Sequence, residues 1–132
     1  MQKKINHANS FWKKKLDPKT YNITREAGTE YAFSGKYWDY FKKGIYLCVC
    51  CGAPLFDSSS KFKSSSGWPS FFKSDYSANI CEKRDASHGM IRIEVLCNIC
   101  NSHLGHVFPD GPEPSGLRYC INSLSLNFVP IE

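Results

Sequence analysis

The chain has 132 residues, 42% of them hydrophobic, and carries 17 Lys and Arg against 12 Asp and Glu, for a net charge of +5. This length holds one domain with a modest core, and no apolar run approaches the roughly 20 residues of a membrane span. The lysines are scattered rather than gathered in a stripe with stacking aromatics, so we predict a solvated basic surface with no nucleic acid or membrane partner.

The N-terminal part is predicted to hold a polar tail and short helices. We interpret residues 1–10 as the tail and residues 11–132 as the folded domain. Ser10 can cap a helix over 11–16, and Asp17-Pro18 is a cap followed by proline at the first helical position. The tail lacks the apolar stretch of a signal peptide. Its lysines resemble a transit peptide, but it lacks arginine and runs into predicted folded sequence.

From Gly44 onward the pattern favours strands. Residues 45–47 are apolar and lead into a C-x2-C pair over 48–51. Residues 91–95 alternate between apolar and charged, which indicates a half-buried strand, and they lead into a second pair over 97–100. Two strands that end in C-x2-C turns predict a small antiparallel β architecture.

The seven cysteines divide into two groups. Four come from the C-x2-C pairs: Cys48, Cys51, Cys97 and Cys100. Four thiolates are what a tetrahedral zinc ion takes in a closed structural site, so we predict one Zn²⁺ per chain, remote from the reactive residues. Three cysteines remain: Cys50, Cys81 and Cys120. Thiolate ligands with a free thiol fit a reducing compartment, and we predict the cytoplasm.

Two histidines follow the second cysteine pair, in His103-Leu-Gly-His106. They could join that pair in a C2H2 zinc site, but the first pair would then have no metal. A four-cysteine site uses the ligands better. The histidines are then free as proton donors, because imidazole titrates near neutral pH.

The last strand carries a polar face beside an apolar one. Side-chain alternation places Arg118, Cys120 and Asn122 on the same face. From Leu124 the apolar positions change parity, which predicts a bulge or a strand break near Asn122. An isolated cysteine is most often a small core residue, but these polar neighbours favour a reactive thiol. We expect Arg118 to lower the pKa of that thiol.

Trp68 lies in Gly67-Trp-Pro-Ser-Phe71, a turn that follows a serine-rich segment. Two interpretations stay open for it: core packing, or the wall of a pocket. A run of turn-forming residues over 109–114 marks a surface loop before the last strand.

Six segments together resemble the B-type methionine-R-sulfoxide reductases. In chain order they are Gly28-Thr-Glu30, Cys48-Val-Cys-Cys-Gly-Ala-Pro-Leu-Phe56, Gly67-Trp-Pro-Ser-Phe71, Cys97-Asn-Ile-Cys100, His103-Leu-Gly-His-Val-Phe-Pro-Asp-Gly-Pro112 and Arg118-Tyr-Cys-Ile-Asn-Ser123. The resemblance covers about residues 11–130. It implies a mainly β fold of two antiparallel sheets, the β-tent, braced by a four-cysteine zinc site and preceded by short helices.

The resemblance also implies an enzyme that reduces the R epimer of protein-bound, and more weakly free, methionine sulfoxide. The implied residues are Cys120 as nucleophile, His103, His106, Asn122 and Trp68 in the substrate site, and Arg118 and Asp110 as support. A thiolate attacks the sulfoxide sulfur while an acid protonates its oxygen, and the thiol becomes a sulfenic acid. The implied partners are oxidised proteins and thioredoxin or a similar thiol, and we expect a monomer.

One position departs from the family pattern. Many members carry a cysteine immediately before Gly-Trp-Pro, which resolves the sulfenic acid as a disulfide, whereas this chain has Ser66. We therefore predict direct reduction by an external thiol. The alternative is that Cys81, which follows the polar stretch 75–80, reaches Cys120 through motion of that stretch as a loop. We expect the metal site to hold Cys50 away from Cys120.

Two other functions compete with this interpretation. A non-catalytic zinc β-tent module for ligand or nucleic acid binding would keep the metal cysteines and could lose Cys120 and the two histidines, but this chain keeps both sets. A thiol peroxidase using Cys120 would not need Trp68.

Overall fold

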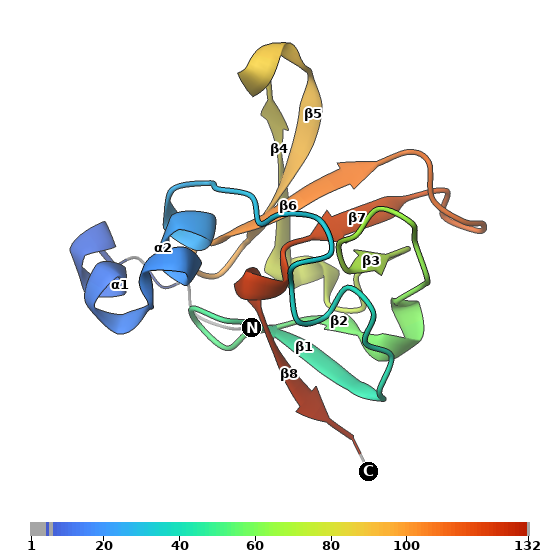
Figure 1. Ribbon diagram of the computed structural model, residues 1–132, viewed down its shortest axis with the longest axis horizontal. Helices are drawn as coiled ribbons and strands as arrows, with labels where there is room; N and C mark the ends of the chain where they lie inside the picture. Colours follow the sequence, from blue (N-terminus) through green and yellow to red (C-terminus); the bar gives the residue numbers. More distant parts are fainter. Residues whose placement is uncertain (1–4, 6, 132) are drawn as a thin grey trace.

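The computed structural model describes residue 5 and residues 7–131, apart from the side chain of His88. Two short helices, α1 (Asn9–Lys15) and α2 (Pro18–Arg25), lie together on one side of the β-strands (Figure 1). As predicted, α2 begins after Asp17, whose Oδ1 accepts a hydrogen bond from the Thr20 N–H at 2.9 Å.

The start of α1 differs from the prediction. Its N-cap is Ala8, which makes no side-chain cap, and Ser10 lies inside the helix. The helix begins earlier because the ring of Phe11 stacks on His7 at 4.0 Å and Trp12 is buried. Arg25 at the end of α2 lies 5.0 Å over the Trp12 ring.

The strands form two antiparallel sheets, which confirms the predicted mainly β architecture. The small sheet has the order β2-β1-β8, with β1 (Gly44–Cys48), β2 (Pro54–Asp57) and β8 (Leu126–Pro130). The large sheet has the order β3-β7-β6-β5-β4, with β3 (Ser70–Phe71), β4 (Ile80–Asp85), β5 (Arg92–Cys97), β6 (His103–Phe108) and β7 (Arg118–Ile121). Short 3-10 turns lie at η1 (Ser58–Ser60), η2 (Ser77–Asn79), η3 (Ser87–Gly89) and η4 (Ser123–Ser125).

Aromatic side chains join the two sheets across the core. Tyr46 of β1 meets Phe71 of β3 edge to face, with ring centroids 5.3 Å apart. Phe56 of β2 stacks on Phe71 at 4.3 Å, and its ring lies 5.8 Å from that of Tyr119 in β7. Because these contacts occupy one face of the large sheet, its other face is left for polar side chains.

The predicted break near Asn122 is present. Strand β7 ends at Ile121, the turn η4 follows, and β8 then joins the small sheet. The apolar parity changes there because the chain leaves one sheet and enters the other.

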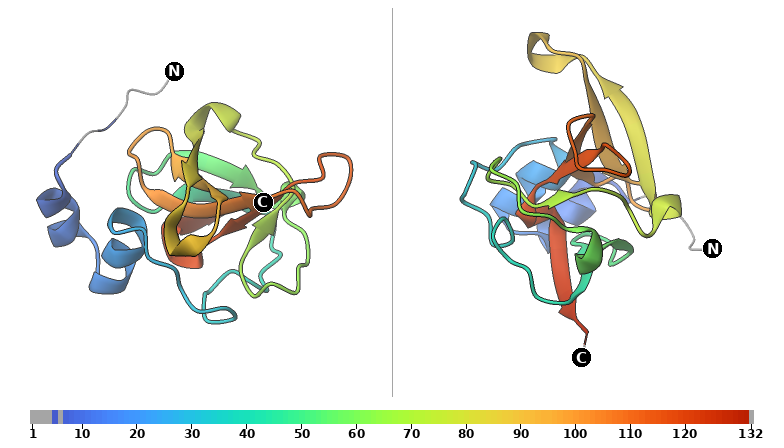
Figure 2. Two further views of the ribbon diagram at one scale, coloured as in Figure 1. Left: turned by 90° about the horizontal axis from the view of Figure 1, so that it is seen from above. Right: turned by 90° about the vertical axis from the view of Figure 1, so that its right-hand side faces the viewer.

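The β4–β5 hairpin projects from the body at the end opposite to β8 (Figures 1 and 2). Ile91 and Ile93 in it are 69% and 37% exposed, and burial starts only at Val95. The predicted strand over 91–95 is therefore half-buried only near its end at Val95. The apolar residues before it stay exposed because the hairpin extends beyond the small sheet.

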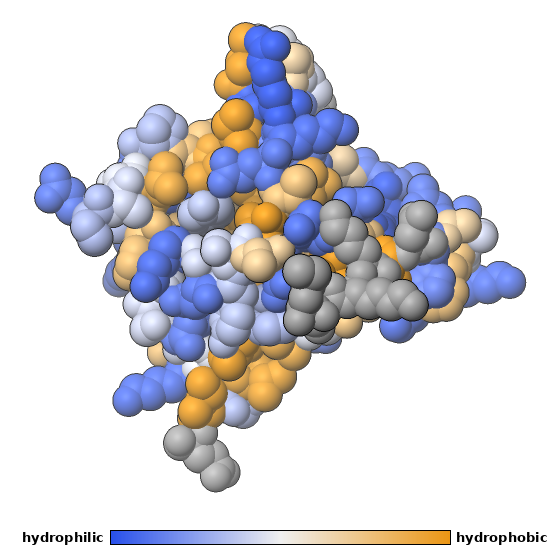
Figure 3. Space-filling view, turned by 180° about the vertical axis from the view of Figure 1, so that it is seen from behind, coloured by the Kyte–Doolittle hydropathy of each residue, from blue (hydrophilic) through white to orange (hydrophobic). Residues whose placement is uncertain are grey.

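Seen from behind, hydrophilic residues cover most of the surface, with apolar patches at the two projecting ends (Figure 3). The exposed apolar residues at the β8 end are Val129 and Ile131. Among the described residues, neither helix has the length and apolar character that crossing a membrane requires.

Candidate active site and metal centre

The polar face of the large sheet brings three strands together at one point. His106 of β6 is the cross-strand partner of Cys120 in β7, and Cys120 is also the partner of Ser70 in β3. Directly opposed residues share a face of the sheet. Beside them lies a cavity of about 210 Å³ whose lining includes Trp68, His106, Arg118, Cys120 and Asn122. The structure thus places the three residues of the predicted polar face, and the predicted tryptophan, around one cavity.

An irregularity in β6 decides how the two histidines lie. Residues three apart on a regular strand point to opposite faces. Here Val95 pairs with Gly105 and Leu96 pairs with His103, so the register skips one residue of β6. This bulge brings the rings of His103 and His106 to 5.5 Å between centroids.

His103 lies behind the cavity rather than in its lining. Its Nδ1 is 2.6 Å from Oε2 of Glu94, and its Nε2 is buried without a hydrogen-bond partner among the described residues. Burial lowers the pKa of His103, although the Glu94 carboxylate opposes that shift. The arrangement suits a supporting histidine better than one that contacts substrate.

His106 faces the cavity and is anchored from the hairpin. Its Nε2 is 2.8 Å from Oδ2 of Asp85, which also lies 3.4 Å from the Arg92 guanidinium. Hydrogen bonds from the side chains of Ser87 and His106 hold the pKa of Asp85 well below its usual range. Asp85 is therefore an anion that fixes the orientation of the ring.

The Cys120 thiol is governed by opposing effects. Burial raises its pKa, whereas the Arg118 charge and a hydrogen bond from the Ser66 hydroxyl lower it. Arg118 lowers the pKa as predicted, but burial is the larger effect and the net shift is upward. Arg118 shares its charge with Asp110, to which it donates hydrogen bonds at 2.9 and 3.1 Å, and its guanidinium lies 4.6 Å over the Phe108 ring.

The backbone of Glu30 makes hydrogen bonds to two residues that line the cavity, Trp68 and Asn122. Its carbonyl oxygen accepts a hydrogen bond from Trp68 Nε1 at 3.0 Å, and its N–H donates to Oδ1 of Asn122 at 3.1 Å. The buried Glu30 carboxyl in turn accepts from the Leu124 N–H at 3.0 Å. The sequence analysis did not find Glu30, Asp85 or Glu94, because their partners are distant in the chain.

The two spare cysteines lie outside the lining of the cavity that holds Cys120. Cys81 lies inside β4, paired with Leu96, and not on a loop. Three strand spacings separate β4 from β7, or about 14 Å, whereas a disulfide needs Cα atoms within about 7 Å. Cys50 is buried in the core and does not line the cavity.

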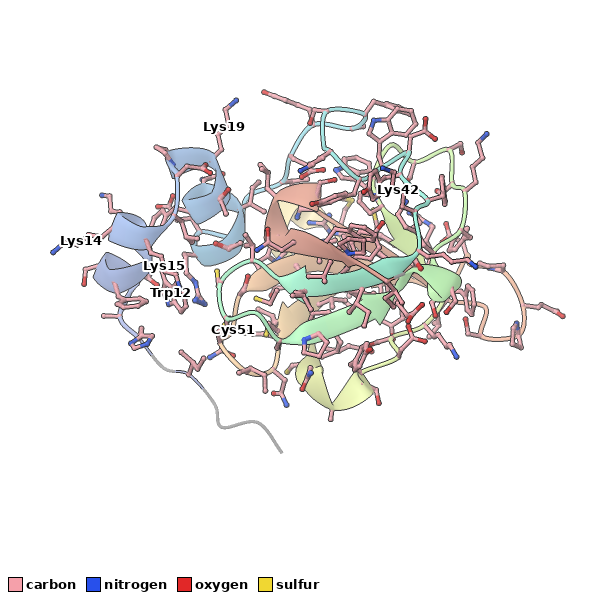
Figure 4. The ribbon with its side chains drawn as sticks, turned by 90° about the horizontal axis from the view of Figure 1, so that it is seen from below. Trp12, Lys14, Lys15, Lys19, Lys42 and Cys51 are labelled. Carbon is pink, nitrogen blue, oxygen red and sulfur yellow. The ribbon has the colours of Figure 1, made fainter. Side chains whose placement is uncertain are left out.

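The four C-x2-C thiols form a cluster that could hold one metal ion: Cys48, Cys51, Cys97 and Cys100. Their sulfurs all lie within 4.8 Å of one another, and two pairs are 3.6 Å apart. Zn–S bonds of about 2.3 Å would place the sulfurs of a tetrahedral site about 3.8 Å apart, so the geometry fits zinc. None of the four lines the cavity beside Cys120, and Cys51 lies on the side of the molecule that carries α1 (Figure 4).

The two cysteine turns are built alike. In the first, the Cys48 N–H donates to the Ala53 carbonyl and the Gly52 N–H donates to the Cys48 carbonyl. In the second, the Cys97 N–H donates to the Ser102 carbonyl and the Asn101 N–H donates to the Cys97 carbonyl. Gly52 and Asn101 both have positive φ, 80° and 65°. One turn closes β1 of the small sheet and the other closes β5 of the large sheet, so a metal ion bound by both turns would join the two sheets.

Comparisons with known proteins agree with this arrangement. A family model described as the SelR domain matches residues 16–130. The peptide methionine sulfoxide reductase MsrB of Thiobacillus denitrificans is 59% identical over 119 residues, which are 90% of each chain. The protein of the same name from Herminiimonas arsenicoxydans is 55% identical over 128 residues, 97% of this chain and 93% of the relative.

Proposed function

This chain belongs to the peptide methionine sulfoxide reductase MsrB family, and on that premise we propose how its own residues reduce the R epimer of protein-bound methionine sulfoxide. Free methionine sulfoxide is the weaker substrate. The family and the intact set of catalytic side chains disfavour a non-catalytic zinc module on the same fold.

Cys120 is the nucleophile in this proposal. Its thiolate attacks the sulfoxide sulfur and the sulfoxide oxygen takes a proton. The net products are methionine, reduced by two electrons, and the sulfenic acid of Cys120, oxidised by two. Ser66 and Arg118 favour the thiolate that burial would otherwise suppress.

His106 supplies the proton. It lines the cavity opposite Cys120, and Asp85 holds its Nε2, which leaves Nδ1 for the substrate oxygen. His103 and Glu94 support this ring from behind. Trp68 offers an aromatic face to the methyl group of the substrate, and Asn122 lies between the Glu30 N–H and the Leu104 carbonyl. The observation that carries the proposal is the His106–Cys120 cross-strand pair beside Trp68 in one cavity.

An external thiol reduces the sulfenic acid directly, with thioredoxin as the expected physiological reductant. The separation of about 14 Å between β4 and β7 supports this route over Cys81. Cys48, Cys51, Cys97 and Cys100 would hold Zn²⁺ as a closed structural site, which would brace the two sheets and leave no open position for substrate. A monomeric state, a cytoplasmic location, the boundary after residue 10 and the absence of a nucleic acid partner stay predictions.

The test is turnover of the separate R and S epimers of blocked methionine sulfoxide, with dithiothreitol or thioredoxin as reductant and peroxide as a control substrate. We expect reduction of the R epimer alone. Cys120→Ser should abolish it, and His106→Asn should reduce it by about 10²–10⁴-fold. Full activity of Cys120→Ser, or preferential turnover of peroxide, would refute the proposal.

A further inference from the structure

A second, larger groove adjoins the active-site cavity. It has a volume of about 710 Å³ and lies between α2 and the segment 29–36. Thr29 lines both the groove and the active-site cavity, so the two are neighbours on one surface. The mechanism described above uses no residue of the groove other than Glu30.

The sizes of the active-site cavity and the groove suggest that they bind different parts of a protein substrate. The active-site cavity, at about 210 Å³, is smaller than the roughly 300–1,000 Å³ of a typical ligand pocket. It suits one side chain, so the rest of a protein substrate must lie outside it. The neighbouring groove falls within the typical range.

The groove has an apolar side and an exposed aromatic residue. Ile23 of α2 and Leu124 of η4 contribute to the lining. Tyr31, also in the lining, is 87% exposed. A large aromatic side chain that borders a groove and stays in water is typical of a binding surface.

Lysines supply the free charge at this groove. Lys19 and Lys36 line it and are exposed, and Lys19 projects outward from α2 (Figure 4). Glu30 is the acidic residue of the lining, but its carboxyl is buried and accepts a hydrogen bond from the Leu124 N–H. Two other carboxyls of this region, Asp17 before α2 and Glu26 after it, do not line the groove.

We propose that this groove binds the polypeptide that flanks the methionine sulfoxide, with an apolar side chain against Leu124 and Tyr31 and acidic side chains beside Lys19 and Lys36. The inference rests on the proposed function and names its preferred substrates. These are segments of oxidised proteins in which apolar and acidic residues adjoin the methionine.

The experiment compares kcat/KM for blocked methionine-R-sulfoxide with that for short peptides. The peptides carry a central methionine-R-sulfoxide flanked by leucine and aspartate, by glycine and serine, or by leucine and lysine. The variants are Tyr31→Ser and the double variant Lys19→Glu, Lys36→Glu. Lys42→Glu is the matched control, because Lys42 is exposed and does not line the groove.

The wild-type chain should prefer the leucine–aspartate peptide over the blocked residue by about tenfold. The double variant should lose about two- to fivefold per lysine on that peptide and gain on the leucine–lysine peptide. Tyr31→Ser should lower kcat/KM for both leucine peptides. Every variant should keep wild-type activity on the blocked residue, and Lys42→Glu should change nothing.

Equal kcat/KM for all peptides in the wild-type chain would overturn the groove assignment. So would equal losses on the peptides and the blocked residue, since that result places the effect in the active site. Failure of the wild-type chain to reduce the blocked residue would instead refute the proposed function.

Discussion

At the scale of single residues, Ser66 occupies the position from which many relatives are expected to resolve the sulfenic acid. It lines the active-site cavity, and its hydroxyl lowers the pKa of the Cys120 thiol. Ser66→Ala removes that hydrogen bond, so the pKa should rise further and less thiolate should be present at neutral pH. We expect kcat/KM to fall about three- to tenfold there and to recover at alkaline pH. An unshifted ascending limb of the pH profile would contradict this role.

Ser66→Cys tests whether a cysteine at this position resolves the sulfenic acid of Cys120 as a disulfide. The new thiol would line the same cavity as Cys120. We expect one equivalent of substrate, without reductant, to leave a disulfide between the new cysteine and Cys120, mapped by mass spectrometry. The wild-type chain should show a trapped sulfenic acid and no disulfide. A Cys81–Cys120 disulfide in the wild-type chain would refute direct reduction.

Glu30 is a buried carboxyl whose pKa is raised by burial, although hydrogen bonds from Leu124 and Ser123 oppose the shift. The carboxyl therefore keeps its proton to a higher pH in the folded state than in the unfolded chain, where its pKa is near 4.5. The stability that it contributes is lost as the pH rises from that value through the folded-state pKa. Glu30→Gln keeps an acceptor for the Leu124 N–H and cannot ionise. The melting temperature of Glu30→Gln minus that of the wild type should therefore increase from acidic to neutral pH.

Glu30→Ala is the informative comparison for that experiment. It leaves the buried Leu124 N–H without its acceptor, at a cost of about 1–3 kcal/mol. The Glu30 carboxyl anchors the backbone that bonds Trp68 and Asn122, so this variant should also lose activity on the blocked substrate, whereas Glu30→Gln should retain it. Equal activity of Glu30→Gln and Glu30→Ala would show that the carboxyl does not position Trp68 and Asn122.

At the scale of elements, the close approach of β6 and β7 holds His106 beside Cys120. Gly105 makes this approach possible, because a Cβ there would lie 2.0 Å from the Cys120 carbonyl oxygen. Gly105→Ala must push the two strands apart, and we expect a loss of about 1–3 kcal/mol in unfolding free energy together with most of the activity.

Gly89 in the projecting hairpin provides the control. A Cβ there would meet nothing within 4 Å, but its φ of +69° is unfavourable for alanine. Gly89→Ala should cost about 1–2 kcal/mol and leave turnover unchanged. Denaturant unfolding and R-epimer turnover of both variants separate the effect on stability from the effect on the site. Full activity of Gly105→Ala would show that the strand spacing is not critical.

At the scale of the whole molecule, the four-cysteine cluster joins the two sheets. Cys48 ends a strand of the small sheet and Cys97 ends a strand of the large one. We expect one zinc per chain by elemental analysis, and Cys48→Ser or Cys97→Ser should lose the metal and lower the melting temperature. Cys81→Ser should keep both values. Metal-free protein with unchanged thermal stability would contradict a structural metal site.

The sequence by itself determined the features that depend on neighbours in the chain. The two C-x2-C pairs predict the cysteine cluster, alternation predicts the shared face of Arg118 and Cys120, and the parity change predicts a bulge or strand break near Asn122. Metal-ligand spacing and strand alternation are both local properties, so the sequence pattern suffices for them.

Only the tertiary structure decided which residues meet across the sheets. The bulge in β6 brings both histidines together, the hairpin carries Asp85 to His106, and the strand order separates Cys81 from Cys120. The pKa of Cys120 also belongs here, because burial outweighs the charge of Arg118, its neighbour in sequence. Pairing register, strand order and burial arise from contacts between distant segments, and short-range sequence patterns do not contain them.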